Sequence, residues 1–171
     1  MEKKMLNDQT GKNIPNIFFK IREDNKWITI NSNQIFQNKK IVLFSLPGAF
    51  TPTCSSKHLP EYEKYAEDIK NQGVDDIYCL SVNDTFVMNA WALNQKISKV
   101  KMLPDGNGDF SKAMNMLVDK KDLGFGMRSW RYSMLVINTK IYKMFIEKFE
   151  PNDPFKVSDA ITMLEYLKLL K

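Results

Sequence analysis

The stretch IVLFSLPGAFTPTC, residues 41–54, decides the fold of this 171-residue chain. Its first half, residues 41–46, is an apolar run typical of a strand buried in the middle of a sheet. A turn beginning at Pro47 follows, and a segment with a helical pattern begins at about residue 53. Cys54 therefore lies where a strand gives way to the N-terminus of a helix. The unpaired N–H groups and the dipole of such an end stabilise a thiolate, the reactive form of cysteine.

Strand and helix patterns alternate along the chain around this stretch. We expect strands at residues 14–21, 26–30, 41–46, 77–82, 100–103, 134–138 and 141–149. We expect helices at about residues 53–72 (with a kink at Pro60), 83–95, 110–118 and 157–170. This order predicts an α/β fold in which helices flank a mixed central sheet and a β-hairpin forms the N-terminal part.

Two local patterns make these expectations more specific. Asp24 and Asn25, between the first two strands, suit a tight hairpin turn. The last helix is expected to bury one face, formed by Val157, Ile161, Leu164, Leu167 and Leu170.

Length, composition and charge limit the possible classes of protein. A chain of this length predicts a single domain, residues 1–171, and no apolar run approaches the roughly 18–20 residues of a membrane helix. The net charge is +5, but the lysines are scattered and only three of the 25 basic residues are arginines. We therefore expect no nucleic-acid partner and no membrane partner. The first residues lack the apolar core of a secretory signal, which favours the cytoplasm, or an organelle lumen if a targeting segment has been removed.

The chain has two cysteines, Cys54 and Cys79, and one histidine, His58. A structural zinc site normally takes four cysteine or histidine ligands, so these residues are too few for one. They also exclude a framework of disulfides. We therefore expect neither a metal nor a cofactor, and a compartment that keeps thiols reduced or oxidises them only transiently.

Three motifs, in order along the chain, resemble the peroxiredoxin family. They are PGAFTPTCSSKHLP at residues 47–60, SVNDTFVM at 81–88 and RSWRYSM at 128–134. The first is similar to the type II group, which includes peroxiredoxin five, and the likeness extends over about residues 14–170. The resemblance implies a thioredoxin-like fold, a homodimer, and a peroxidase that reduces hydroperoxides. Its reducing partner would be glutathione with glutaredoxin, or thioredoxin.

The resemblance also implies a role for each of four site residues. Cys54 would be the peroxidatic thiol, whose sulfur attacks the peroxide and becomes a sulfenic acid. Arg131 would supply a cation next to the sulfur and donors to the peroxide, and the Thr51 hydroxyl would bind the peroxide as donor and acceptor. Pro47 would shield the thiolate from water. We choose Arg131 over Arg128 because the family places its catalytic arginine directly before an aromatic residue and a small-apolar pair.

Simpler interpretations of the same residues stay open at this stage. Cys54 could be an inert buried thiol, Thr51 a helix N-cap, and Pro47 only a turn former. Arg131 could pair with a surface carboxylate, which would leave Arg128 as the catalytic arginine. Otherwise Arg128 would support the site or contact the second subunit of a dimer. His58, four residues after Cys54, could tune the thiolate or have a structural or interface role.

Some type II peroxiredoxins carry a resolving cysteine in the region that corresponds to residues 150–157, and this chain has none there. Its other thiol, Cys79, lies 25 residues beyond Cys54 inside an apolar strand. A disulfide needs Cα atoms within about 7 Å, which a cysteine in the middle of a strand reaches only by local unfolding. We therefore expect a one-cysteine cycle, in which an outside thiol attacks the sulfenic acid.

Two other classes of function are weaker. A disulfide oxidoreductase would need a second cysteine in the segment CSSK, residues 54–57, to complete a C-x-x-C motif. A non-catalytic holdase that keeps the fold would be expected to have lost Cys54, Thr51 or Arg131, and all three are present.

Overall fold

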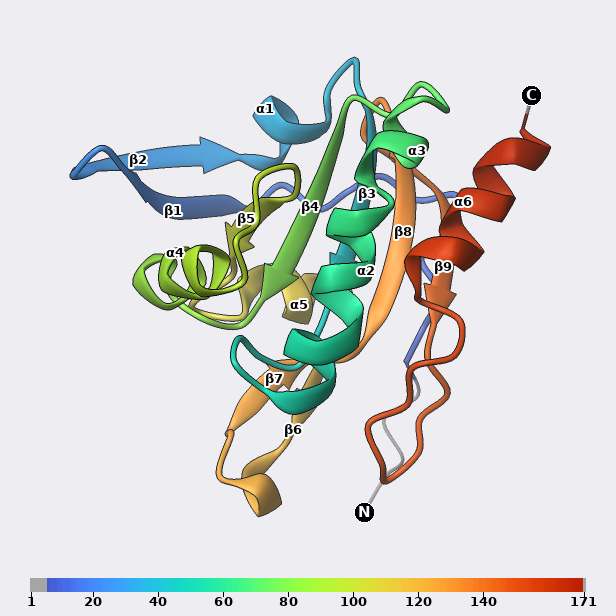
Figure 1. Cartoon of the computed structure of the whole chain (residues 1–171). Coiled ribbons are helices and arrows are strands. Elements are labelled where there is room, and N and C mark those ends of the chain that lie inside the picture. The colour runs from blue at the N-terminus through green and yellow to red at the C-terminus, as the bar shows by residue number, and fades with distance from the viewer. Residues whose placement is uncertain (1–5, 171) are drawn as a thin grey trace.

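A five-stranded mixed sheet forms the centre of the computed structural model, which describes residues 6–170. Its strands lie in the order β5 (Lys101–Pro104), β4 (Asp76–Ser81), β3 (Lys40–Ser45), β8 (Tyr132–Ile137) and β9 (Lys140–Ile146) (Figure 1). β3, β4 and β5 are parallel, whereas β8 runs antiparallel to β3 and to β9. The apolar run of β3 is buried on both faces because it lies in the middle of this sheet. The predicted α/β fold with a mixed central sheet is confirmed.

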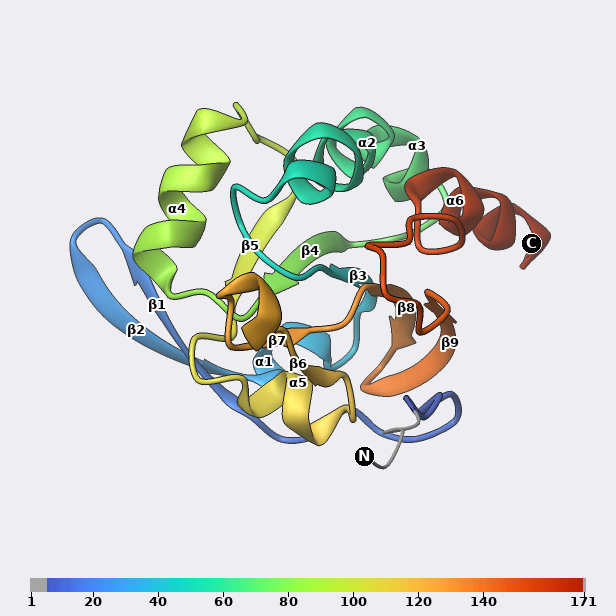
Figure 2. The same ribbon diagram turned by 90° about the horizontal axis from the view of Figure 1, so that it is seen from below.

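One face of the sheet is covered by helices, as Figure 2 shows. They are α2 (Leu59–Lys64), α3 (Ala66–Lys70), α4 (Thr85–Asn94) and α6 (Ala160–Leu169). Their buried side chains pack with Val42, Phe44 and Cys79 of the sheet into one hydrophobic cluster, which also includes Cys54. The reactive cysteine candidate therefore belongs to the core on the helical side of β3.

The opposite face carries the helices α1 (Ser32–Phe36) and α5 (Asp109–Ala113) and the hairpin of β1 (Phe18–Glu23) and β2 (Lys26–Asn31) (Figure 2). The hairpin is antiparallel and turns at Asp24 and Asn25, whose φ angles are 47° and 61°. Asparagine and aspartate tolerate positive φ, which two-residue hairpin turns require, so the predicted hairpin is confirmed. α1 was not predicted; it is short and held by a capping box between Asn31 and Gln34.

The helix expected at 110–118 was wrong in its second half. α5 ends at Ala113, and Asn115 adopts a left-handed φ of 57°, which stops the helix. The chain then forms β6 (Leu117–Asp119), which pairs with β7 (Met127–Ser129) across the 3-10 turn η2 (Lys121–Leu123). This small hairpin carries Arg128 toward the end of β3.

The last helix starts later than expected and buries only part of the predicted face, because Leu164 and Leu167 are buried as predicted. Asp159 caps it by accepting a hydrogen bond from the Thr162 N–H, so residues 157–159 lie outside α6. Val157, Ile161 and Leu170 are exposed, contrary to the prediction. The side chains that α6 buries are those of Ala160, Met163, Leu164 and Leu167.

The helical segment predicted at 53–72 consists of three pieces. A π-helix, η1 (Cys54–His58), leads into α2, and the break before α3 lies at Tyr65 rather than at Pro60. Pro60 lies in the first turn of α2, where its missing N–H costs no hydrogen bond. Gly73, with a φ of 83°, follows the segment and ends it.

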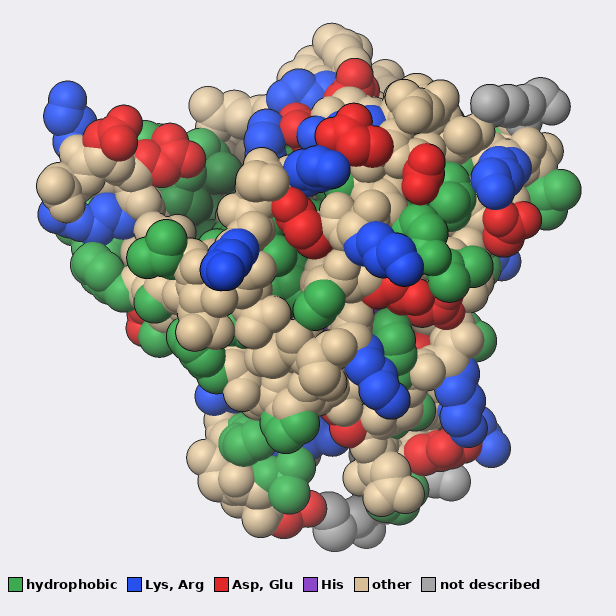
Figure 3. Space-filling model, viewed as in Figure 1, with side chains coloured by type: hydrophobic (Ala, Val, Ile, Leu, Met, Phe, Trp, Pro, Cys, Tyr) green, Lys and Arg blue, Asp and Glu red, His purple; other side chains and the backbone are tan. Residues whose placement is uncertain are grey.

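The surface carries basic side chains one by one, interspersed with acidic ones, on the face shown in Figure 3. Within residues 6–170, no helix is long and apolar enough to cross a membrane.

Candidate active site

The loop between β3 and η1 sets the position of Cys54. Pro47 and Gly48 are buried at its start, and the Ala49 N–H donates to Asn83 Oδ1 at 2.9 Å. The Thr51 hydroxyl donates to the Gly48 carbonyl at 2.7 Å. Because the Thr51 hydrogen is used there, its oxygen presents lone pairs to an incoming molecule.

Gly48 is required by the close packing of this loop. A Cβ atom at this position would lie 3.1 Å from Arg128 Nη1 and 3.2 Å from Thr51 Cγ2. Both distances are tighter than ordinary van der Waals contact, so any larger residue would push Thr51 or Arg128 aside. The loop therefore depends on glycine for its close approach to the small hairpin.

Cys54 is the first residue of η1 and is completely buried. Its carbonyl accepts from the Leu59 N–H, five residues on, which is the spacing of a π-helix. The Ser55 N–H donates to the Thr51 carbonyl at 3.0 Å, so Thr51 is joined to this turn through its main chain. The Thr51 side chain does not cap the helix, which removes one of the simpler interpretations of this residue.

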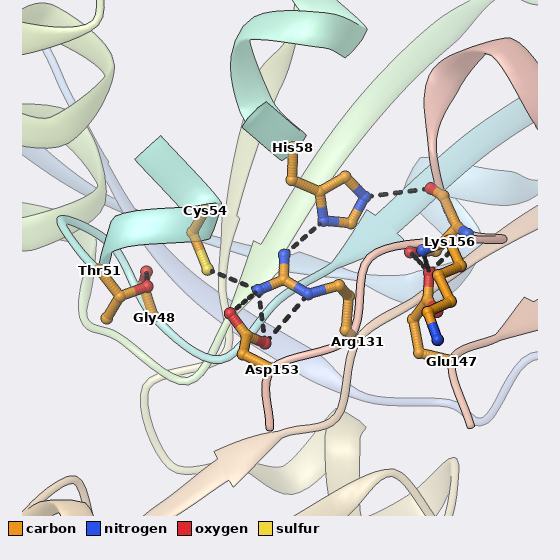
Figure 4. A network of polar contacts seen from close by, with 9 residues as sticks. Gly48, Thr51, Cys54, His58, Arg131, Glu147, Asp153 and Lys156 are labelled. Carbon is orange, nitrogen blue, oxygen red and sulfur yellow. Dashed lines mark hydrogen bonds and ion pairs between the residues drawn. The ribbon is translucent and has the colours of Figure 1, made fainter. Parts of the chain in front are cut away.

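Arg131 lies next to Cys54 although the two are 77 residues apart in the chain. Its Nη2 donates to Cys54 Sγ at 3.4 Å, and its side chain is only 1% exposed (Figure 4). Burial alone would lower the pKa of the guanidinium, but the adjacent Cys54 and Asp153 raise the pKa overall. A buried arginine with a sulfur partner is therefore held in its charged form.

Two further side chains bind the same guanidinium. Asp153 accepts from Nε at 3.2 Å and from Nη2 at 2.6 and 2.7 Å. His58 Nδ1 lies 2.9 Å from Nη1. Since arginine can only donate, Nδ1 must accept, and Nε2 then carries the hydrogen and donates to the Ser158 carbonyl at 3.1 Å. The site therefore holds a neutral histidine.

The surroundings of His58 keep it neutral. Burial, and then the charge of Arg131, lower the pKa of His58 well below its ordinary value. A protonated ring would lose the acceptor that receives the hydrogen of Arg131. The hydrogen bonds of the His58 ring go to Arg131 and Ser158, so His58 is linked to Cys54 through Arg131.

Residues 147–158, which we call the covering loop, bring Asp153 and Ser158 to the site. Buried Glu147 accepts from the N–H groups of Lys156, Val157 and Ser158 and from the Ser158 hydroxyl. Burial alone would raise the pKa of Glu147, but these hydrogen bonds together lower it, so the carboxylate stays charged. The ionised side chain of Glu147 thus joins the start of the covering loop to its end.

Arg128 and Cys79 lie outside this network. Arg128 donates to the carbonyls of Phe125 and Val82, at 3.0 and 3.2 Å, and packs beside Gly48. Cys79 is buried in β4, and burial, followed by the charge at Cys54, raises the pKa of its thiol well above the ordinary value. Both cysteines are free thiols.

Sequence reasoning brought Cys54 and Arg131 together but missed Asp153. Nothing in the Asp153-Pro154 pair distinguishes it from an ordinary turn, and the covering loop has no helix or strand pattern. The chemistry of Arg131 offered one signal. A buried guanidinium requires a negatively charged hydrogen-bond acceptor beside it, which predicts a nearby carboxylate.

The arrangement suits nucleophilic attack by sulfur. A buried thiol faces a fixed cation that can donate to a bound oxygen, and a hydroxyl oxygen able to accept lies on the adjoining loop. No group of three or more histidine, cysteine, aspartate or glutamate side chains able to hold a metal ion occurs within residues 6–170.

Comparisons with known proteins find the same kind of relative by family model, by sequence and by structure. Residues 9–164 match the family model described as Redoxin. The chain is 57% identical to the hybrid peroxiredoxin hyPrx5 of Haemophilus influenzae, covering 95% of this chain and 67% of that protein. It is 56% identical to peroxiredoxin sll1621 of Synechocystis, over 93% of this chain and 91% of the relative.

Two solved structures have the same fold at lower identity. The Plasmodium falciparum antioxidant protein, a 1-Cys peroxiredoxin, gives a TM-score of 0.89 at 41% identity, covering 95% of this chain and 99% of that one. Reduced Prx3 of Vibrio vulnificus, in complex with hydrogen peroxide, gives 0.87 at 39% identity, covering 92% and 98%.

Proposed function

Because this chain belongs to the peroxiredoxin family and resembles its type II, peroxiredoxin-five-like members, we propose that it reduces hydrogen peroxide and alkyl hydroperoxides through Cys54 with an external thiol as reductant. The Cys54 thiolate attacks the terminal oxygen of the peroxide and forms a sulfur–oxygen bond. The oxygen–oxygen bond breaks, and its electron pair leaves with the other oxygen, which takes a proton and departs as water or an alcohol. Sulfur is oxidised to sulfenic acid.

Each proposed site residue serves one need of this step. Arg131 stabilises the thiolate and donates to the peroxide oxygens as negative charge develops on the leaving one. The Thr51 hydroxyl oxygen accepts a hydrogen bond from the peroxide, because the hydroxyl hydrogen is donated to the Gly48 carbonyl. Pro47, buried at the start of the loop and without an N–H group, limits the access of water. The observation that carries the proposal is the contact of 3.4 Å between Arg131 Nη2 and Cys54 Sγ.

We propose that the reductant is glutathione, acting with glutaredoxin, or thioredoxin. The outside thiol attacks the sulfenic acid, releases water and forms a mixed disulfide, which a second thiol then reduces. Cys79 is a poor resolving thiol because burial keeps it protonated and only the thiolate is a nucleophile. The likeness to a protein described as a 1-Cys peroxiredoxin supports the same cycle.

One equivalent of peroxide, given without reductant, should leave a sulfenic acid at Cys54 that dimedone traps. Excess peroxide should drive it to the sulfinic acid and inactivate the enzyme. Turnover with glutathione and glutaredoxin, and separately with thioredoxin, then identifies the reductant. A non-reducing digest is the control, and a stoichiometric Cys54–Cys79 disulfide within one chain would contradict the one-cysteine cycle.

We further propose that residues 1–171 act as one domain, in the cytoplasm or an organelle lumen, and associate as a homodimer. Three exposed rings lie at or beside α4: Phe50, on the loop before Cys54, contacts the buried Trp91 of this helix, and Phe86 of the same helix contacts Trp27 of β2. Figure 3 shows hydrophobic side chains at the surface over α4 and the β1–β2 hairpin. Exposed apolar patches of this kind often mark interfaces.

The dimer makes a measurable prediction. Sedimentation velocity should give twice the 19.9 kDa of one chain, and Phe86→Asp should shift the population toward the monomer because it buries a charge in the contact. Leu169→Asp is the charge-matched control, because Leu169 is an apolar residue at 81% exposure on α6, on the other side of the molecule from α4 (Figure 1). A wild-type protein that sediments as a monomer would contradict the proposal.

A further inference from the structure

The Arg131 guanidinium is shared among three partners in a defined way. Asp153 occupies one edge of the fork, where Nε and Nη2 donate to its carboxylate. His58 accepts from Nη1 on the other side. Nη2 carries two hydrogens, so one can serve Asp153 while the other points at Cys54 Sγ (Figure 4). The plane of the group is therefore held from two sides.

We propose that Asp153 is a positioning residue for the peroxidase reaction, whose carboxylate holds the Arg131 guanidinium in the plane that directs Nη2 at Cys54 and the bound peroxide. This inference rests on the proposed role of Arg131 in that reaction. Asp153 itself touches neither sulfur nor peroxide. It acts by fixing a long side chain that otherwise has several rotatable bonds.

The electrostatics separate this role from a simple charge effect. An anion beside Arg131 offsets part of the attraction between the guanidinium and the Cys54 thiolate, so Asp153 gives no benefit through charge alone. Attraction between charges depends mainly on distance, whereas a hydrogen bond to a leaving oxygen depends steeply on direction. Asp153 should therefore matter for the peroxide transition state and not for the general reactivity of the thiolate.

The covering loop places Asp153 where this role requires it. The ring of Phe155, two residues on, lies 5.8 Å from Arg131 Cζ and 4.9 Å from the ring of His58. Glu147 fixes the end of the loop through Lys156, Val157 and Ser158. The Asp153 side chain is 40% exposed, so a substitution there removes the carboxylate that binds Arg131 without opening a core cavity.

The test compares two reactions of the same thiol. Asp153→Asn keeps the shape of the side chain and removes the negative charge of the carboxylate. Its rate constant with hydrogen peroxide should fall about tenfold, while alkylation of Cys54 by iodoacetamide, in which no oxygen leaves, should be unchanged or faster. Glu150→Gln is the matched control, since that carboxylate lies on the same loop but pairs with Lys148. It should leave both rates as in the wild type.

A double-mutant cycle decides whether Asp153 acts through Arg131. Asp153→Asn should cost nothing further in a protein that already carries Arg131→Met. An unchanged peroxide rate in Asp153→Asn, an equal fall in both reactions, or an additive loss in the double variant would each overturn the proposal. A wild-type protein that fails to consume peroxide in the same assay would instead overturn the proposed function.

Discussion

Cys54→Ser is expected to reduce peroxide consumption to the rate of the uncatalysed reaction. The serine hydroxyl is nearly isosteric with the thiol, so the contact with Arg131 and the π-helix should be kept. An alcohol is not ionised near neutral pH, however, and cannot form the sulfenic acid on which the cycle depends. The measurement is consumption of hydrogen peroxide under single turnover, followed by a label specific for sulfenic acid.

Cys79→Ser is the matched control, because it makes the same change of sulfur to oxygen in the other buried cysteine. It should keep most of the turnover, since Cys79 is a buried thiol of β4 and the proposed cycle gives it no part. Its cost should appear as a loss of stability, because a buried hydroxyl replaces an apolar thiol. Retained turnover in Cys54→Ser would remove the assignment of the nucleophile.

The parts of the fold that could be predicted are those whose signal is local. The apolar run of β3 and the Asp24-Asn25 turn are each encoded within a few consecutive residues. The errors arose where two local patterns compete. Residues 117–119 fit a helix or a strand, and pairing with β7 decided the outcome.

The candidate site likewise has one part that local sequence patterns predict and one part that they do not. The position of Cys54 follows from the strand and helix patterns around it, whereas the partners of Arg131 come from segments far apart in the sequence. His58 is 73 residues away from Arg131, and Asp153 is 22 residues away on a loop without periodicity. Only the folded chain brings such groups together, because no repeating pattern encodes the contact.

The break in the predicted helix at 53–72 has a consequence for the site. An α-helix beginning at Cys54 would join each N–H to the carbonyl four residues earlier, but here the Cys54 carbonyl accepts from Leu59. The extra residue per turn changes the direction in which the following side chains point. His58 thereby comes within hydrogen-bond distance of Arg131, a placement that the sequence spacing alone did not predict.

Arg131→Lys is expected to lower the rate constant with hydrogen peroxide by about tenfold or more, which corresponds to about 1.4 kcal/mol or more of barrier. Lysine keeps the positive charge but has no fork, so it cannot bind Asp153, His58 and the peroxide at the same time. The charge that stabilises the thiolate is kept, whereas the directed donors to the leaving oxygen are lost. Stopped-flow measurement of the reaction with peroxide under single turnover reports this step directly.

Arg128→Lys provides the comparison that makes the result specific. Arg128 donates to two backbone carbonyls and lies beside Gly48, whereas the guanidinium that donates to Cys54 is that of Arg131. Its replacement should loosen the packing of the small hairpin and cost less in peroxide reactivity than Arg131→Lys. If the two variants ranked in the opposite order, Arg128 would be the arginine that acts on the peroxide. The contact between Arg131 and Cys54 would then serve only to neutralise a buried sulfur.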